Sequence, residues 1–204
     1  MVTDVIKEEL KRCFKHSKIL FVISIAIFLT GFLMGSAIIY FIDLLTLLEC
    51  GGALSESSLN QFSDFEITSQ YIIKHNGIEV LVLISGSFFL GLTTLSNLFI
   101  NGIAIGTVIM ASILKGVSLT TLLLLILPHG VFELPALFIA GAAGFKMPYE
   151  LIRYLRNKKD YILNREEIKD FLILSSVAMV LIVIAGIIEA NVTLLIAETI
   201  GFQG

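Results

Sequence analysis

Long apolar runs follow one another along the chain. Three runs carry no formal charge and cover residues 19–42, 80–114 and 171–188. A fourth run, 116–145, is interrupted only by one histidine and one glutamate. Each run reaches or exceeds the roughly 18 to 20 residues that a helix needs to cross the hydrocarbon core of a bilayer. The pattern therefore predicts several membrane-spanning segments.

Composition supports a membrane as the solvent of this chain. Hydrophobic residues make up 56% and charged residues 15%, whereas soluble domains are about half apolar and a quarter charged. Backbone groups in the bilayer core must be satisfied internally, which leaves only helices or a closed barrel. The runs lack the short alternating segments of a barrel. We therefore expect a single all-α membrane domain over residues 1–204.

The positive charges set the expected orientation. Of fourteen Lys and Arg residues, five lie in 1–18 and seven in 146–169. By the positive-inside rule both segments are cytoplasmic. The segment 43–77 carries five acidic residues against one lysine, and we expect it on the outer side. An odd number of crossings must then lie between residues 77 and 146, and this length holds three helices better than one.

These counts predict a polytopic helical bundle with five spans, an inner N-terminus and an outer C-terminus. The expected spans are residues 18–42, 78–97, 99–115, 118–145 and 170–190. The boundary between the second and third spans lies in SNLFINGIAIG, residues 96–106. This stretch forms either a tight intramembrane turn or part of one continuous helix. In the second case a broken hairpin at Pro128 would return to the inner side without a full crossing.

Three segments lie outside the predicted spans. Residues 1–17 have apolar positions at helical spacing opposite lysines, so they form either an amphipathic helix on the inner leaflet or a plain extension of the first span. The outer segment 43–77 forms either a short packed helix or an unstructured tether. The basic loop 146–169 is a topology determinant first and a docking surface second. Cys13 and Cys50 lie on opposite sides of the first span, so they cannot pair with each other within one chain.

Small residues at four-residue spacing mark where helices are expected to touch. In lipid, helices associate through close backbone approach and interhelical hydrogen bonds. Two G-x-x-x-G pairs and two similar pairs occur along the spans: Gly31 with Gly35, Gly102 with Gly106, Ser87 with Gly91, and Ala140 with Gly144. We interpret them as sites of tight helix packing, and a dedicated dimer interface is the other interpretation.

The stretch ILPHGVFELPALF, residues 126–138, carries the candidate polar site. His129 and Glu133 are four residues apart and share one face of a helix. Pro128 and Pro135 bracket them and free backbone carbonyls, and Gly130 lies between them. A charged carboxylate at mid-bilayer costs about 2.5 kcal/mol or more unless it is protonated, paired or hydrated.

Other polar residues in the spans are candidate partners of this pair. They are Asn97, Asn101, Glu189 and Asn191. Two interpretations stay open: the polar residues fix helix register through hydrogen bonds, or they line a path for an ion or a proton. Whether they hold a metal is also open.

Several function classes lack support in the sequence. The chain has no zinc-protease, nucleophile-elbow or phosphate-loop motif, so we expect neither an enzyme nor a bound cofactor. Acidic residues balance the basic loop, which argues against nucleic-acid binding. The expected partners are the lipid bilayer, a second copy of the chain in a homo-oligomer, a dimer being the simplest, and other membrane or envelope proteins.

The strings NLFINGIAIG, ILPHGVFELPALFIAGAAGF and IAGIIEANVT resemble the stage II sporulation protein M family of integral membrane proteins. The resemblance runs from about Asn76 to Thr193, and its most specific part is L-P-H-G-x-x-E-L-P-A at Leu127 to Ala136. It implies a multi-helix membrane protein. The signature polar residues of the family correspond here to Asn101, Gly102, His129, Gly130, Glu133, Pro135 and Glu189.

The resemblance also implies a role. The namesake of the family acts with a peptidoglycan hydrolase and a second membrane-anchored partner during engulfment of the forespore. The family also occurs in bacteria and archaea that make no spores. The resemblance thus favours a scaffold or complex-forming component of the cytoplasmic membrane, with a small transporter or channel as the alternative.

Overall fold

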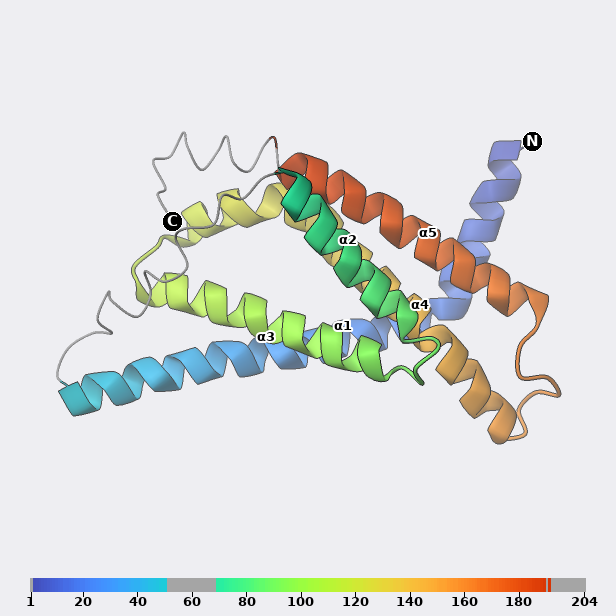
Figure 1. Ribbon diagram of the computed structural model, residues 1–204, viewed down its shortest axis with the longest axis horizontal. Coiled ribbons are helices and arrows are strands. Elements are labelled where there is room, and N and C mark those ends of the chain that lie inside the picture. The colour runs from blue at the N-terminus through green and yellow to red at the C-terminus, as the bar shows by residue number, and fades with distance from the viewer. Residues whose placement is uncertain (1, 51–68, 190, 192–204) are drawn as a thin grey trace.

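The structure, a computed structural model, describes residues 2–50, 69–189 and 191. The helices in this part of the chain follow one another without strands (Figure 1). They are α1 (Val2–Cys50), α2 (Ser69–Ser85), α3 (Leu92–Leu114), α4 (Leu119–Leu155) and α5 (Arg165–Ile188). The all-α prediction is confirmed. Of the predicted outer segment 43–77, residues 51–68 lie outside the described ranges, whereas residues 43–50 belong to α1 and residues 69–77 to α2.

Four stretches in the described residues are long and apolar enough to cross a membrane. They are Lys7–Leu45, Leu92–Leu114, Gly130–Leu155 and Arg165–Ile188. Two shorter apolar helices, Asn76–Ser85 and Leu119–Pro128, accompany them. Large apolar side chains remain exposed on the outside of the bundle, including Leu33 at 67% and Phe88 at 73%. Such a surface suits lipid, and the protein is a polytopic membrane protein with about five crossings.

Helix α1 is longer than one crossing requires. Its 49 residues correspond to about 70 Å of helix, compared with roughly 30 Å of hydrocarbon. Figure 1 shows that the dark blue N-terminal part turns away from the lighter remainder. Residues 2–17 therefore continue the helix of the first span, and the N-terminal part of α1 lies at an angle to the rest (Figure 1). Their location on the inner leaflet stays a prediction.

The turn between α2 and α3 lies earlier than the sequence suggested. It occupies residues 86–91, where the Gly91 N–H donates to the Gly86 carbonyl at 2.7 Å and Gly91 takes a left-handed φ of 79°. Asn97 and Asn101 lie inside α3 instead. The predicted boundary at 97–99 is wrong, and so is the alternative of one helix over 78–114. The left-handed conformation favours glycine, which explains why the chain turns at Gly91.

Helix α4 is continuous through its prolines. Pro128, Pro135 and Pro148 all lie inside Leu119–Leu155, so the alternative of a broken hairpin at Pro128 is wrong. A proline removes one backbone hydrogen bond and bends a helix, and neighbouring helices in a membrane protein can tolerate this. Figure 1 shows the yellow first part of α4 turning into the orange remainder. The prolines therefore bend the span without ending it.

Helices α1 and α3 meet along their glycines. A methyl group on Gly31 would overlap the Phe99 carbonyl oxygen, and one on Gly102 would overlap that of Phe28. Gly35 and Gly106 are equally close to the opposite backbone. Because both G-x-x-x-G pairs face each other within one chain, they form an internal seam.

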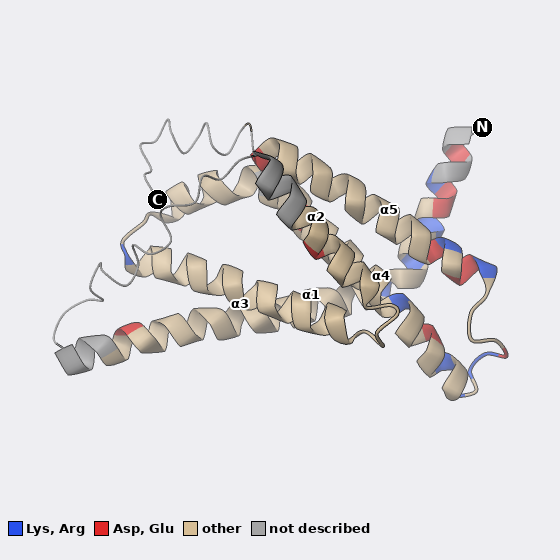
Figure 2. Cartoon of the chain, in the orientation of Figure 1, with Lys and Arg blue, Asp and Glu red and all other residues tan. Residues whose placement is uncertain are grey.

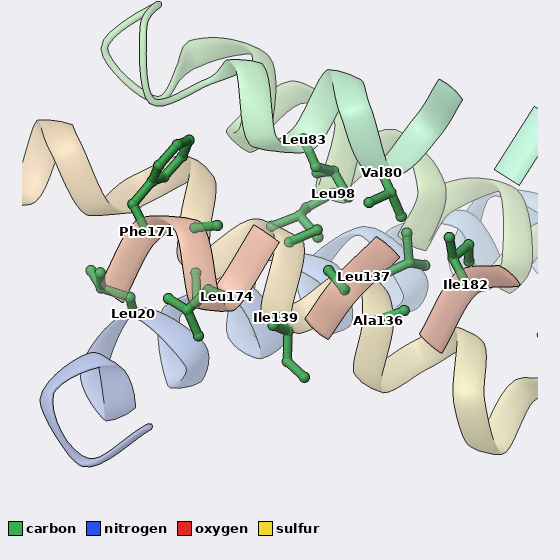
Figure 3. Packing of buried hydrophobic residues seen from close by; sticks show 14 of the residues in the cluster. Leu20, Val80, Leu83, Leu98, Ala136, Leu137, Ile139, Phe171, Leu174 and Ile182 are labelled. Carbon is green, nitrogen blue, oxygen red and sulfur yellow. The ribbon is translucent and has the colours of Figure 1, made fainter. Parts of the chain in front are cut away.

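Small residues also build the core around α4. Ala136, Ala140 and Ala143 are fully buried, and Leu137 is nearly so. Side chains from α2, α3 and α5 pack on this face of α4 (Figure 3). Gly144 extends this face, because a methyl group there would overlap the Leu83 carbonyl. The predicted close packing at residues 140–144 therefore lies at the centre of the bundle.

Hydroxyl groups tie the neighbouring helices together. The Thr94 hydroxyl donates to the Leu83 carbonyl at 2.8 Å, joining α3 to α2. The Ser87 hydroxyl of the turn donates to the Ala143 carbonyl of α4 at 2.5 Å. Thus Ser87 contributes a hydrogen bond from the turn, whereas the sequence pattern had placed it in a helix seam.

Candidate functional site

A cavity of about 470 Å³ opens between α1, α3 and α4. We call it the outer cleft, because the predicted orientation places it toward the outer half of the membrane. Glu133 of α4 and Glu189, which directly follows α5, both line it. The structure therefore brings together the two acidic residues that the sequence had assigned to a polar site.

The walls of the outer cleft are mainly apolar. Asn76, Glu133 and Glu189 are the polar residues among those that line it. The remaining lining residues are apolar side chains or glycine: Phe28, Leu29, Phe32, Ala104, Ile105, Val108, Ile109, Ile126, Gly130 and Leu134. The Glu133 carboxylate also lies close enough to Glu79 and Glu189 for their negative charges to act on it. The cleft thus concentrates acidic groups on an apolar surface.

The predicted asparagines lie apart from the outer cleft. The Asn101 side-chain amide donates to the Asn97 side-chain oxygen at 3.0 Å, so the two residues satisfy each other along α3. Neither belongs to the lining of the cleft. The Asn191 side-chain amide donates to the Ile187 carbonyl, four residues earlier, at 2.7 Å. The polar site predicted from the sequence is therefore two separate groups: the acidic residues at the outer cleft and the asparagine pair along α3.

Gly130 and His129 are the two remaining candidate residues of the proline-bracketed stretch. Gly130 is buried and lines the outer cleft. His129 lies within α4, but its side chain is outside the described part of the structure. Within the described residues, no three His, Cys, Asp or Glu side chains come together as a metal site.

A second polar region lies at the opposite end of the bundle. Figure 2 shows Lys, Arg, Asp and Glu gathered there on α1, α4 and α5. At its centre Lys146, Glu150 and Asp170 are 3%, 2% and 2% exposed. The Lys146 ammonium is 3.2 Å from an Asp170 carboxylate oxygen and 4.0 Å from one of Glu150. We call this region the charged end; in the orientation predicted from the positive-inside rule it lies toward the cytoplasm.

Further cations surround the buried carboxylates of the charged end. Lys159 and Arg153 each lie 3.0 Å from Glu150. Arg12 of α1 contacts Asp170 at 3.4 Å and also pairs with Glu166. Every buried acid of the charged end thus has at least two basic partners, which offset the cost of its desolvation.

The start of α5 holds this network in place. The Asn164 side chain accepts from the Glu167 backbone at 2.9 Å, and the Glu167 side chain accepts from the Asn164 backbone at 2.9 Å. This reciprocal pair is a capping box, which satisfies backbone donors at the helix start. Glu167 also bonds Lys159 at 2.5 Å, so the cap is coupled to the ion pairs.

Sequence reasoning missed the charged end. The basic loop was interpreted as a topology determinant, and its acids only as balancing charge. The four-residue spacing of Lys146 and Glu150 was an available signal, since such residues share one face of a helix. Nothing in the spacing showed that Asp170 of the next helix would meet them.

Comparisons with known proteins agree with this architecture. The family model of stage II sporulation protein M matches residues 24–194. An uncharacterized protein of Methanocaldococcus jannaschii is 36% identical over 177 residues, which cover 86% of this chain and 94% of that protein. A second uncharacterized protein of the same organism is 31% identical over 126 residues, 60% of this chain and 55% of that protein. The match thus spans about half of the second relative. No solved structure matches the chain.

Proposed function

This chain belongs to the stage II sporulation protein M family of membrane proteins, and we propose that it is a non-enzymatic, complex-forming component of the cytoplasmic membrane. In this proposal the outer cleft receives a transmembrane helix of a partner. The observation that carries it is the pair of carboxylates, Glu133 and Glu189, on the wall of a mainly apolar cleft.

The chemistry of the cleft defines the partner. An apolar helix face would fill the walls formed by residues such as Phe28, Phe32 and Ile105. A lysine or arginine on that helix would pair with Glu133 or Glu189, and intramembrane charges are commonly paired in this way. The partner we propose is therefore a membrane helix with one basic residue in its outer half.

A second copy of the chain is the simplest such partner. Lys115 directly follows α3, is exposed, and lies on the predicted outer side. The internal use of the G-x-x-x-G pairs in the α1 and α3 seam means that those motifs no longer argue for a dimer. The proposal of a homo-oligomer therefore depends on the outer cleft alone. The mass of the purified complex in detergent tests this proposal.

Crosslinking in native membranes tests the docking proposal. We expect mild crosslinking and purification of the wild type to recover a stoichiometric membrane partner or a second copy. The double substitution Glu133→Gln and Glu189→Gln should reduce that recovery at least tenfold. Asp43→Asn is the matched control, because Asp43 lies on the outer half of α1 and does not line the cleft. Equal recovery with the double variant, or a wild-type chain that purifies alone, would contradict the proposal.

The same cleft favours one alternative, a small transporter or channel for a cation or proton. Carboxylates inside a membrane often mark such paths. Flux through liposomes separates the two functions: the alternative predicts ion or proton movement that Glu133→Gln abolishes. Absence of ion or proton flux through the folded wild-type protein in liposomes would exclude it.

A further inference from the structure

The charged end contains a cavity of its own, of about 960 Å³. It lies between α1, α4, the loop after α4 and the start of α5. The buried network of Lys146, Glu150 and Asp170 forms its floor, since all three line it and are at most 3% exposed. The cavity therefore has a base of buried, ion-paired side chains at the predicted cytoplasmic surface.

Positive charge exceeds negative charge in this cavity. Its six basic lining residues are Lys15, Lys146, Arg153, Arg156, Lys158 and Lys159. Its four acidic lining residues are Glu150, Glu166, Glu167 and Asp170. With the lining histidine neutral, the formal charge of the cavity is two positive.

The excess cations are the ones at the rim. The acids pair with Lys146, Arg153, Lys159 and the neighbouring Arg12. By contrast, Lys15, Arg156 and Lys158 are exposed, and within the described residues they form no ion pair. Their charges face a cavity whose other charges are already compensated, so they are available to an anion.

Apolar side chains complete the rim on the side of the membrane. Ile19 of α1 is 53% exposed and Ile152 of α4 is 52% exposed, and both line the cavity. Tyr161 adds an exposed ring. A ligand that satisfies both parts of the rim needs an anionic group and an attached apolar portion, as an anionic phospholipid has. Basic pockets between transmembrane helices on the cytoplasmic side suit such headgroups.

We propose that the cavity at the charged end binds a phosphate group, and that this phosphate is the headgroup of an anionic lipid of the inner leaflet. Arg156 and Lys158 contact the phosphate, and Ile19 and Ile152 contact the glycerol and the first part of the acyl chain. This site is separate from the outer cleft and does not depend on what the cleft binds.

Thermal unfolding of the full chain in detergent tests the site. Phosphatidylglycerol should raise the unfolding temperature in a saturable way, and phosphatidylcholine should not. In Arg156→Gln combined with Lys158→Gln, the apparent affinity for phosphatidylglycerol should fall about 30-fold, because each cation near an anionic surface contributes about 1 kcal/mol. Both residues are exposed outside the buried network, so the variant should fold.

Lys11→Gln combined with Lys18→Gln is the matched control, since these lysines are exposed on α1 but do not line the cavity. It should keep the wild-type affinity for phosphatidylglycerol. An equal loss in both double variants would show general attraction to charged lipid and overturn the proposal. Inorganic phosphate provides the second arm. If it alone gives the full stabilisation and displaces phosphatidylglycerol, the lipid assignment is overturned.

Discussion

The two ends of the bundle both place carboxylates where water is scarce, but they surround them differently. At the charged end, Glu150 and Asp170 share the Lys146 cation and have further basic partners. At the outer cleft, burial and the negative charges of Glu189 and Glu79 all act on Glu133. Like-charged neighbours do not compensate each other, whereas an opposite charge does.

This difference separates a structural role from a binding role. A buried ion pair is complete within the chain, and losing one partner leaves an uncompensated charge. Acidic groups on the wall of an apolar cleft mark a place where a cation, a proton or a basic residue of a partner helix can bind. Substitutions at the charged end should therefore lower the stability of the protein. Substitutions in the outer cleft should instead impair the binding of its partner.

Removing the shared cation should give the largest effect. Lys146→Met leaves Glu150 and Asp170, each 2% exposed, without their common partner. We expect a loss of up to about 3 to 5 kcal/mol in the free energy of unfolding, the cost of a broken buried pair, because Arg153, Lys159 and Arg12 keep part of the compensation. Thermal unfolding followed by circular dichroism in detergent measures it. Lys11→Gln, an exposed lysine on α1, should leave the unfolding temperature unchanged, and an equally small change in Lys146→Met would contradict the structural role.

The α1 and α3 seam should give the next largest effect. Gly102→Val would push side-chain atoms into the Phe28 carbonyl, and overpacking of this kind costs about 1 to 3 kcal/mol. Because Phe28 also lines the outer cleft, partner recovery should fall as well.

A matched glycine isolates the steric cause. Gly77→Ala in α2 has no other heavy atom within 4 Å of the added methyl group, so it should preserve both stability and partner recovery. The same unfolding and crosslinking assays apply to both variants. If Gly102→Val is as stable as Gly77→Ala, the close approach of the two backbones is not required.

Periodicity and charge were enough to predict the helical class and the crossings. The apolar runs have the length that a bilayer demands, whereas the orientation that the two basic segments predict stays a prediction. The glycine spacing also indicated close packing, because only a missing side chain permits backbone contact at Gly31 and Gly102. These features depend on local sequence, which explains why they could be predicted.

Contacts between distant helices could not be predicted in the same way. Polarity drew attention to Asn97 and Asn101 as a turn, but their amides satisfy each other inside α3. The chain turns at Gly91, whose left-handed conformation is a backbone property that composition does not show. Likewise, the contact of Lys146 with Asp170 joins two helices across a loop, and no spacing rule reaches across it.

Removing the charge of Glu133 in the outer cleft should change the stability of the protein little but reduce the binding of its partner. Glu133→Gln keeps the size of the side chain and removes its capacity for charge. We expect the free energy of unfolding to stay within about 1 kcal/mol of the wild type, since polar contacts between membrane helices average roughly 0.6 kcal/mol. Partner recovery after crosslinking should nevertheless decrease. A large loss of stability would instead assign Glu133 the structural role that Lys146 has.

The asparagine pair should give the smallest effect and shows where the cleft ends. Asn101→Leu removes the 3.0 Å hydrogen bond to Asn97, and such a bond between membrane side chains is worth about 0.6 kcal/mol. Because neither residue lines the outer cleft, partner recovery should equal that of the wild type. The unfolding and crosslinking assays on Asn101→Leu and Glu133→Gln then form a direct contrast. Reduced recovery of the partner with Asn101→Leu would show that the asparagines belong to the same binding site as the acidic residues, and that the binding surface extends along α3.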